Sequence, residues 1–448
     1  MRIEKLTFIA ILPFILKGLS IHAQEQVSPS PVNLCSTHEV MEVYYMNNPE
    51  AKAEQDEREI FTRQFVQAVK AANAGANTQK NVLPKYRIPV VCHVYGNNFW
   101  GKTLTDQQIQ DAINEATKDF QALNADFSTV NNNFSSLKSG IDLSFELAKK
   151  DPNGNPTNGI DRKTTTGAGY GNANGYDSKI AADAWNCKMY FNIYIVADIY
   201  NNGVNNNSGV CWYPDVAMTN ANTARCVFNG QYIGTNSTNA EFRAVLTHEF
   251  GHFMNLIHTF EGGCTGSGDN VSDTPVHSST TLGCPTSQTS NTPISDCGNW
   301  VINSENYMDY NGASCGYKNF TKGQVARMEA ALNKNDVTRF PLWQTSNLIA
   351  TGLLDPTEVN TINDAVYVQQ LYPNPSVGMV NLELDIRHAD QYRIEVSNTL
   401  GQVVYCKILP DVSGAFKTTI DLQNQSKGLY FISISASTGK RVLKLIKE

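Results

Sequence analysis

The sequence predicts an α+β fold for the middle of the chain, followed by a small all-β sandwich at its C-terminal end. Over residues 86–345, strand-like apolar runs are interspersed with helical patterns of apolar residues. Over residues 365–448, six short apolar segments recur at regular spacing between turn residues, which is typical of an antiparallel sandwich. The 448 residues, of which 41% are hydrophobic, suffice for several folded units.

Residues 1–23 have the charge and hydropathy order of a secretory signal peptide. Arg2 and Lys5 precede an apolar run over 6–16, and Ala23 offers a small residue at the expected cleavage point. Eleven apolar residues are too few to cross a bilayer, and no later segment is long and apolar enough to do so. We therefore expect an exported chain without a transmembrane segment, in a compartment that permits disulfides.

Residues 24–85 are polar and helix-prone, and apolar residues at helical spacing indicate a helix over 49–74. The place of this segment, between an export signal and a core, indicates either a propeptide or a docking helix. We assign 24–85 as a propeptide. Residues 346–364 contain no aromatic residue and no helical period, so we expect them to be a linker.

Two capping boxes mark the helices of the central domain. Thr105 and Gln108 start an amphipathic helix predicted over 105–127, and the segment 238–241 precedes a second helix with a buried apolar stripe. The strands are predicted from β-rich, alternating or continuous apolar runs at 87–95, 141–147, 189–199 and 226–233.

The charge balance excludes two classes of partner. Lys and Arg number 35 against 42 Asp and Glu, which gives a net charge of −7. A protein that binds nucleic acid by neutralising phosphates, or one that binds a membrane surface through basic clusters, needs a basic excess. We expect neither nucleic acid nor an anionic membrane surface as a partner.

Three histidines and a glutamate at fixed spacing form the strongest chemical signal in the sequence. His248 and His252 are four residues apart on a predicted helix, so their imidazoles project from one face toward a common ion. Glu249 is expected to take a proton from water instead of binding that ion. His258 reaches the same ion only if the chain turns sharply near Asn255, a residue type that tolerates the left-handed conformation. The alternative, buried structural histidines, requires three of the eight histidines to take this spacing by chance.

This segment, HEFGHFMNLIHTF, resembles the extended zinc motif HExxHxxGxxH of the metzincins, with Asn255 in the usual glycine position. Three further segments resemble the pappalysin family in the same order: GDNVSDTP at 268–275, NYMDY at 306–310 and FTKGQVARM at 320–328. The resemblance implies a metzincin-like zinc-peptidase domain, in which a twisted mixed sheet carries an active-site helix.

The resemblance also implies roles for single residues. Met308 would lie under the zinc as a hydrophobic floor, and Tyr310 would donate a hydrogen bond to the oxyanion as water adds to the scissile carbonyl. Asp269, the Ser272 carbonyl and Thr274 match a calcium site in the loop that follows the third histidine. A solvated acidic loop is the alternative, because two carboxylates are a weak calcium signal.

The ten cysteines are compatible with disulfides in an exported protein. Four of them lie between the metal-binding helix and the segment 320–328, and four cysteines allow three connectivities. The family resemblance implies the crossed one, which pairs Cys264 with Cys297 and Cys284 with Cys315. Cys406 is expected to be unpaired. The pairing of four others stays open, although the last two could close a third loop: Cys92, Cys187, Cys211 and Cys226.

Cys35 lies in the expected propeptide, in the segment LCSTHE. The surrounding sequence, with NPE at 48–50, resembles latent members of the family, in which a C-G-T-like motif precedes a helix. Ser36 stands here in the glycine position. A thiolate is a good zinc ligand, so Cys35 could fill the fourth position and exclude water until the propeptide is cut. A disulfide to another cysteine is the alternative.

One departure from the family concerns specificity. Family members that prefer a basic residue after the scissile bond carry an acidic residue just before the last of the four paired cysteines, where this chain has Ser314. The preference for Arg or Lys is therefore in question, unless Asp309 or another carboxylate substitutes.

The C-terminal segment resembles the sorting domain of the type IX secretion system. The resemblance rests on LYPNP at 371–375, GQVV at 401–404, GLYFI at 428–432 and a final strand with Lys and Arg. It implies passage across the inner and outer membranes with the type IX machinery as a partner. An ordinary accessory β-domain is the alternative.

Together these observations predict a secreted or cell-surface zinc endopeptidase, made as a latent zymogen and acting on protein substrates. We expect a monomer, with an extended substrate pairing along an edge strand at 227–233. The rival hypothesis is a catalytically silent zinc-binding adhesion or binding protein of the same fold. Glu249 argues against it, because a silent protein has no use for a base.

Overall fold

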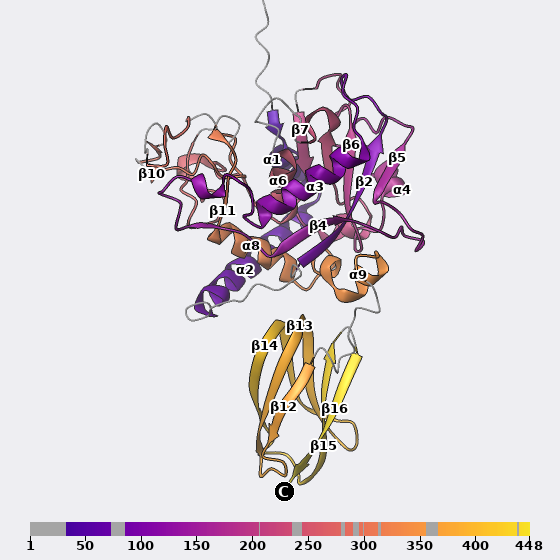
Figure 1. The fold of residues 1–448 in the computed structure, drawn as a ribbon, viewed down its shortest axis with the longest axis vertical. Coiled ribbons are helices and arrows are strands. Elements are labelled where there is room, and N and C mark those ends of the chain that lie inside the picture. Colours follow the sequence, from indigo (N-terminus) through magenta and orange to yellow (C-terminus); the bar gives the residue numbers. More distant parts are fainter. Residues whose placement is uncertain are drawn as a thin grey trace, which may run out of the picture.

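The computed structural model describes most of the central and C-terminal parts of the chain (Figure 1). The described residues are 33–72, 86–205, 207–234, 244–278, 283–289, 295–298, 300–311, 315–354, 366–436 and 439–448. The expected signal peptide, the capping box at 238–241 and Ser314 lie outside them.

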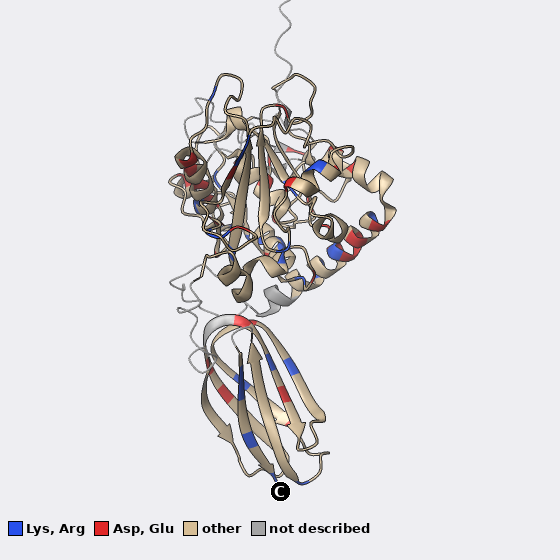
Figure 2. Cartoon of the chain, turned by 90° about the vertical axis from the view of Figure 1, so that its right-hand side faces the viewer, with Lys and Arg blue, Asp and Glu red and all other residues tan. Residues whose placement is uncertain are grey.

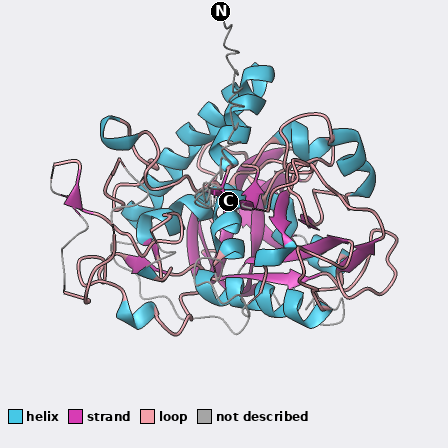
Figure 3. Ribbon diagram, turned by 90° about the horizontal axis from the view of Figure 1, so that it is seen from above, coloured by secondary structure: helices cyan, strands magenta, loops and turns pink. Residues whose placement is uncertain are grey.

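A seven-stranded mixed sheet forms the centre of the larger part. Its strands follow the order β1 (Asn33–Cys35), β7 (Asn207–Cys211), β8 (Cys226–Asn229), β6 (Phe191–Val196), β2 (Tyr86–Tyr95) and β4 (Leu143–Leu147), and β5 (Ile160–Lys163) pairs with the far end of β2. All neighbours are parallel except β7 and β8. The strands predicted at 87–95, 141–147 and 189–199 are thus confirmed. Figure 3 shows strands (magenta) with helices (cyan) on either side.

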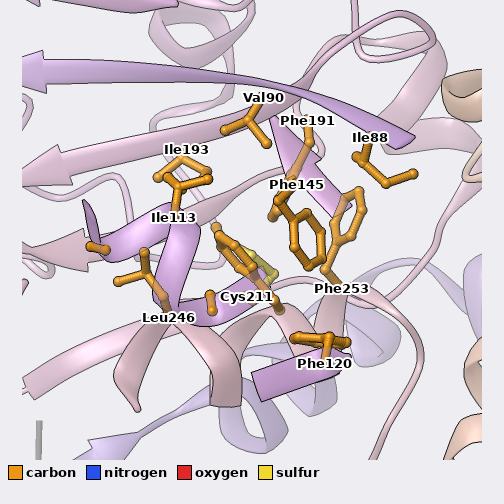
Figure 4. Packing of buried hydrophobic residues seen from close by; sticks show 14 of the residues in the cluster. Ile88, Val90, Ile113, Phe120, Phe145, Phe191, Ile193, Cys211, Leu246 and Phe253 are labelled. Carbon is orange, nitrogen blue, oxygen red and sulfur yellow. A yellow bond between two sulfur atoms is a disulfide. The ribbon is translucent and has the colours of Figure 1, made fainter. Parts of the chain in front are cut away.

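Helices α3 (Asp106–Phe120) and α6 (Val245–Phe253) pack together and against this sheet. Figure 4 shows Ile113 and Phe120 of α3 and Leu246 and Phe253 of α6, which belong to one core cluster with the strand residue Phe191. Aromatic rings fill this core, with Phe191 stacked on Phe253 at 3.6 Å between ring centroids. The core therefore fixes the position of α6, which carries two of the predicted metal ligands.

The helix predicted over 105–127 is shorter than expected. Its capping box is present, with Thr105 and Gln108 each bonding the backbone of the other. The helix ends at Phe120 because Ala122 takes a left-handed conformation, φ 57°, which L-residues do not adopt inside a helix. Residues 127–129 form a separate 3₁₀ turn.

The predicted edge strand at 227–233 is wrong in two respects. Strand β8 ends at Asn229, and Gly230–Tyr232 form a 3₁₀ turn. More importantly, β8 is an inner strand that pairs with β7 on one side and β6 on the other. The strand beyond it, β7, takes the edge position of the central domain, and the N-terminal strand β1 pairs along that edge.

The N-terminal segment packs as an integral layer of the larger part. After β1, helices α1 (Thr37–Asn47) and α2 (Pro49–Ala72) follow, and α2 lies along α8 (Lys322–Asn333). Their apolar side chains join a cluster with the central sheet, to which the segment contributes Val40, Met41, Tyr44 and Ala51.

Shorter elements complete the larger part. They are α4 (Asp177–Asp183), α5 (Val216–Asn220), η4 (Gly263–Thr265), η5 (Phe340–Trp343), the antiparallel pairs β3 (Lys138–Ser139) with β11 (Phe320–Thr321) and β9 (Ser295–Asp296) with β10 (Trp300–Val301), and α9 (Thr345–Ala350). Helix α9 falls in the predicted linker. Arg87 donates to the carbonyl of Leu353, so residues up to 354 belong with the larger part, and residues 355–365 lie outside the described ones.

The C-terminal part is all β, as predicted. Its strands are β12 (Val366–Tyr372), β13 (Met379–Asn398), β14 (Val403–Asp421), β15 (Gly428–Ala436) and β16 (Gly439–Lys447), in the order β12-β13-β15-β16 with β14 also on β13. Four of the six predicted segments merge into the two long strands β13 and β14, because register shifts near 386–392 let these strands bend without ending. Strand β12 was not predicted.

Figure 2 shows acidic and basic residues intermixed over both parts. Among the helices that the structure describes, none combines the length and apolar character needed to cross a membrane.

Candidate metal centre and active site

Three histidine side chains converge at the end of α6. His248 and His252 lie one helical turn apart, and their Nε2 atoms are 3.2 Å from each other. The Nε2 atom of His258 lies 3.3 Å from that of His248 and 3.1 Å from that of His252. The turn that brings His258 back occurs at Asn255, whose φ of 67° is the left-handed conformation expected from the sequence.

Backbone carbonyls orient two of these rings. The Nδ1 atom of His248 lies 2.6 Å from the carbonyl oxygen of Tyr307, and the Nδ1 atom of His252 lies 2.8 Å from that of Leu256. A carbonyl accepts only from a protonated Nδ1, so each neutral ring keeps its Nε2 lone pair for a shared ion. Burial lowers the pKa of His248 to about 4 and those of His252 and His258 well below the usual value, which keeps the rings neutral.

Cys35 supplies a fourth ligand atom. Its Sγ lies 3.4 Å from Nε2 of His252, and the four ligand atoms of Cys35, His248, His252 and His258 all lie within 4.8 Å of one another. All four residues are buried. Three nitrogens and one sulfur in this arrangement fit a tetrahedral zinc site. Without a cation, three nitrogen lone pairs would face one another in a buried space.

Glu249 lies beside this centre and contacts the N-terminal segment. Its Oε2 is 3.4 Å from Oγ1 of Thr37 and 3.5 Å from Sγ of Cys35. Burial raises the pKa of Glu249 to about 8. Strand β7 passes so close that a Cβ at Gly209 would lie 2.8 Å from Cγ of Glu249, so this position requires glycine.

Thr37 is a contact that sequence reasoning missed. Its hydroxyl donates toward Glu249 and accepts from the backbone N–H of Cys211, at 3.0 Å, at the end of β7. No local pattern singles it out, because β1 ends at Cys35 and Thr37 is the first residue of α1.

Tyr310 and Met308 both lie beside the metal centre. The Tyr310 hydroxyl donates to the carbonyl of Cys35 at 2.8 Å and lies 3.4 Å from Nε2 of His258. Met308 is fully buried under α6, where a Cβ at Gly251 would lie 2.4 Å from its Sδ. The glycine within HEFGH therefore makes room for the methionine.

Comparisons with known proteins agree with this geometry. Residues 174–333 match the peptidase family model described as pregnancy-associated plasma protein-A. An extracellular metalloprotease of Verticillium alfalfae is 30% identical over 281 residues, which cover 60% of this chain and 82% of that protein. The chain belongs to the pappalysin family.

Other relatives match parts of this pappalysin. An extracellular metalloprotease of Colletotrichum graminicola is 38% identical over 149 residues, which cover 32% of the chain and 49% of that protein. The chain thus spans about half the length of the first curated relatives it matches. A promirolysin mutant of Tannerella forsythia is 27% identical with a TM-score of 0.56, and the match covers 72% of the chain and 100% of that protein.

The C-terminal part matches a different model. Residues 370–448 match the secretion system C-terminal sorting domain. This match, together with the extracellular relatives, indicates a secreted or cell-surface protein.

Three disulfides stabilise the pappalysin domain. Cys264 pairs with Cys297 and Cys284 with Cys315, which is the crossed pattern implied by the resemblance. A third bridge joins Cys211 of β7 to Cys226 of β8, directly across the antiparallel pair. The free cysteines of the described residues are Cys35, Cys92, Cys187 and the exposed Cys406.

The predicted calcium residues are only partly brought together. Asp269 is buried, and its Oδ1 accepts from the hydroxyl of Thr274 at 2.6 Å and from the N–H of Val271 at 3.1 Å. Its Oδ2 has no hydrogen-bond partner among the described residues, and burial raises its pKa to about 7. Ser272 is exposed. Asp273 accepts instead from Thr321 and from the N–H of Gly323.

Proposed function

We propose that this chain is a secreted zinc endopeptidase of the pappalysin family that is made in a latent form. The observation that carries the proposal is the convergence of three neutral histidine Nε2 atoms beside a buried glutamate. The extracellular metalloproteases among its relatives support it. A zinc ion held by His248, His252 and His258 would supply Lewis-acid chemistry that polarises the scissile carbonyl and acidifies water.

The side chains around the centre have separate tasks. Glu249 takes a proton from the attacking water and passes it to the leaving amine, a role for which a raised pKa is suited. Tyr310, whose hydroxyl points to a carbonyl oxygen of the N-terminal segment, donates in the same way to the oxyanion of the substrate. Met308 packs against Gly251 and forms the hydrophobic floor beneath the metal centre.

Latency follows from three contacts of the N-terminal segment. Cys35 fills the fourth ligand position, the Thr37 hydroxyl engages Glu249, and β1 pairs along the edge of β7. An extended substrate needs the same edge, because strand addition supplies its main-chain hydrogen bonds. We therefore assign substrate pairing to β7 in place of β8. The promirolysin neighbour supports a latent form.

The test is cleavage of denatured casein by the purified chain, before and after removal of residues 24–85, with zinc content measured in parallel. Glu249→Gln should lower the rate about 10²–10⁴-fold at unchanged zinc content. Cys35→Ser should raise the activity of the uncut chain, and a chelator should abolish cutting. Thr37→Val should raise the activity of the uncut chain further, because it removes the hydroxyl that contacts Glu249. Thr37→Ser keeps this hydroxyl and serves as the control. If no variant cuts after removal of 24–85 with zinc bound, the silent binding protein is the better hypothesis.

A calcium ion at Asp269 is part of the proposed function, because it would satisfy the unpartnered buried Oδ2. Without calcium, the pKa of Asp269 is higher in the folded chain than in the unfolded chain, so protonation of this carboxyl at low pH favours the folded state. The free energy of unfolding should then fall as pH rises from about 4 to about 7. Calcium should oppose this fall, and Asp269→Asn should remove both effects. Thermal unfolding between pH 4 and 8, with and without calcium, measures the pH dependence of stability and the effect of calcium on it. If Asp269→Asn leaves the pH profile unchanged, the calcium site at Asp269 is contradicted.

A further inference from the structure

The loop that follows His258 lies against the turn that carries Met308 and Tyr310. The backbone N–H of Thr259 donates to the carbonyl of Met308 at 3.2 Å. The Phe260 ring stacks on that of His258, with the ring planes 10° apart, and it also meets the Tyr310 ring at 4.8 Å between centroids. The third metal ligand and the proposed oxyanion donor therefore depend on the same packing.

His277 bridges these two segments. Its Nε2 lies 3.0 Å from Oδ2 of Asp309 and 3.1 Å from Oγ1 of Thr259. Its ring also meets the Phe260 ring edge-on, at 5.9 Å between centroids. Asp309 directly precedes Tyr310 in sequence, whereas the other two partners directly follow the third metal ligand. One imidazole therefore contacts three residues that adjoin the reacting groups.

This contact is buried, and its carboxylate is fully engaged. His277, Asp309 and Thr259 are each at most 2% exposed. Oδ2 of Asp309 also accepts from the Thr259 hydroxyl at 3.2 Å, and Oδ1 accepts from the N–H and the side-chain amide of Asn311 at 2.8 Å each. Hydrogen bonds to a buried carboxylate are strong and restrict the geometry of both partners. Because the chain itself holds both oxygens, Asp309 fixes the turn before Tyr310 and is not available to pair with a basic side chain of a substrate.

We propose that His277 is a positioning residue for Tyr310 and that it acts through Asp309 and Phe260. The proposal rests on the proposed peptidase function and adds the group that holds the oxyanion donor in place. Tyr310 has a single hydroxyl with which to meet the oxyanion, and a displacement of about 1 Å costs on the order of 10²-fold in rate. His277 restrains the turn that carries Tyr310 and the aromatic ring beside it, so it restrains that hydroxyl.

A second buried histidine provides a matched control. His93 of β2 is fully buried, with its Nδ1 3.1 Å from Oδ2 of Asp161 and its Nε2 2.9 Å from Oδ1 of Asn192. These two partners belong to strands β5 and β6. Loss of either imidazole removes buried hydrogen bonds and should lower stability, but only the loss of His277 should change catalysis.

The experiment measures kcat and KM for a peptide taken from a mapped casein cut site, with the purified chain after removal of residues 24–85. His277→Phe keeps a ring against Phe260 and removes the Nε2–H donor. It should lower kcat about 10–10²-fold at nearly unchanged KM and zinc content, because the restraint acts on a group that binds the transition state. His277→Gln, whose amide can donate to Asp309, should recover most of this loss. His93→Phe should leave kcat unchanged.

A double-mutant cycle with Tyr310→Phe separates positioning from general stability. If His277 acts through the Tyr310 hydroxyl, His277→Phe should lower kcat by less than about threefold in the Tyr310→Phe chain. Asp309→Asn, which keeps the shape of the side chain, takes the place of His277→Phe in the cycle if that variant does not fold.

Three results would overturn the proposal: an unchanged kcat in His277→Phe, an equal loss in His93→Phe, or additive losses in the cycle. If the wild-type chain cuts no casein with zinc bound, the peptidase function itself fails, so the two failures are distinguishable.

Discussion

The two ends of the chain are attached to the central domain in opposite ways. The N-terminal segment contributes Val40, Met41, Tyr44 and Ala51 to a core shared with central residues such as Trp212 and Val227. The C-terminal sandwich has a core of its own, in which every member lies between residues 366 and 445. The first end is a layer of the domain, and the second is a separate folding unit.

The polar contacts of the N-terminal segment reinforce this difference. Glu59 of α2 forms a bidentate ion pair with Arg327 of α8. Arg327 also donates to the carbonyl of Asn255 at 2.6 Å. Gln55 of α2 donates to the side chain of the same Asn255 at 3.1 Å. The segment thus holds the turn between the second and third histidines as well as the fourth ligand position. The docking of the N-terminal segment and the geometry of the metal centre are therefore coupled through Asn255.

The largest expected effect comes from Glu59→Ala. The substitution leaves the buried Arg327 without its carboxylate, and breaking such a pair should lower the free energy of unfolding of the uncut chain by about 3–5 kcal/mol. Denaturant unfolding of the uncut chain measures the loss. The exposed Glu57→Ala on the same helix is the control, expected within about 0.5 kcal/mol. Equal effects of the two substitutions would show that the ion pair does not hold α2.

A somewhat smaller effect separates the two cores directly. Met41→Ala removes a buried side chain from the shared core and should lower the stability of the central unfolding transition by about 2–4 kcal/mol. Ile394→Ala, at an equally buried position in the sandwich, should lower only the transition of the sandwich. Calorimetry resolves the two transitions. If Ile394→Ala moves both, the sandwich is not an independent unit.

The smallest effect is expected from removing the sandwich. A chain that ends after residue 354 keeps the contact between Arg87 and the Leu353 carbonyl, together with both clusters of the larger part. Its central transition should stay within about 0.5 kcal/mol of that of the full chain. Its rate of casein cleavage after removal of 24–85 should also be unchanged. A loss of several kcal/mol would mean that the sandwich supports the catalytic domain.

Local patterns predicted those parts of the site that depend on short stretches of chain. The spacing of His248 and His252 needs only a helical turn, and the left-handed Asn255 needs only a residue that tolerates that conformation. The capping box at Thr105 was likewise visible in four residues. The family resemblance supplied Met308 and Tyr310, which no local pattern would have singled out.

Several errors arose at element ends and where an outcome depended on distant segments. Strand β8 was assigned to an edge because its residues have the pattern of a short strand, but neighbours on both sides come from elsewhere in the chain. The predicted bounds of the helix ending at Phe127 and of the six sandwich strands were wrong, because turns and register shifts determine where these elements end. The contacts of Thr37 with Glu249 and of Asp309 with His277 were not foreseen, because the partners are remote in sequence.

The sequence by itself determined the α+β and all-β character of the two parts and the sorting domain, and it predicted the metal ligands, the base and the export signal. It did so because helix period, strand alternation and short motifs are local properties. Only the tertiary structure decided that Cys35 reaches the three histidines, that β1 covers β7 and that Asp309 is paired with His277. These depend on which segments cover which edge and fill which cavity, and that choice is made by the packing of the whole domain.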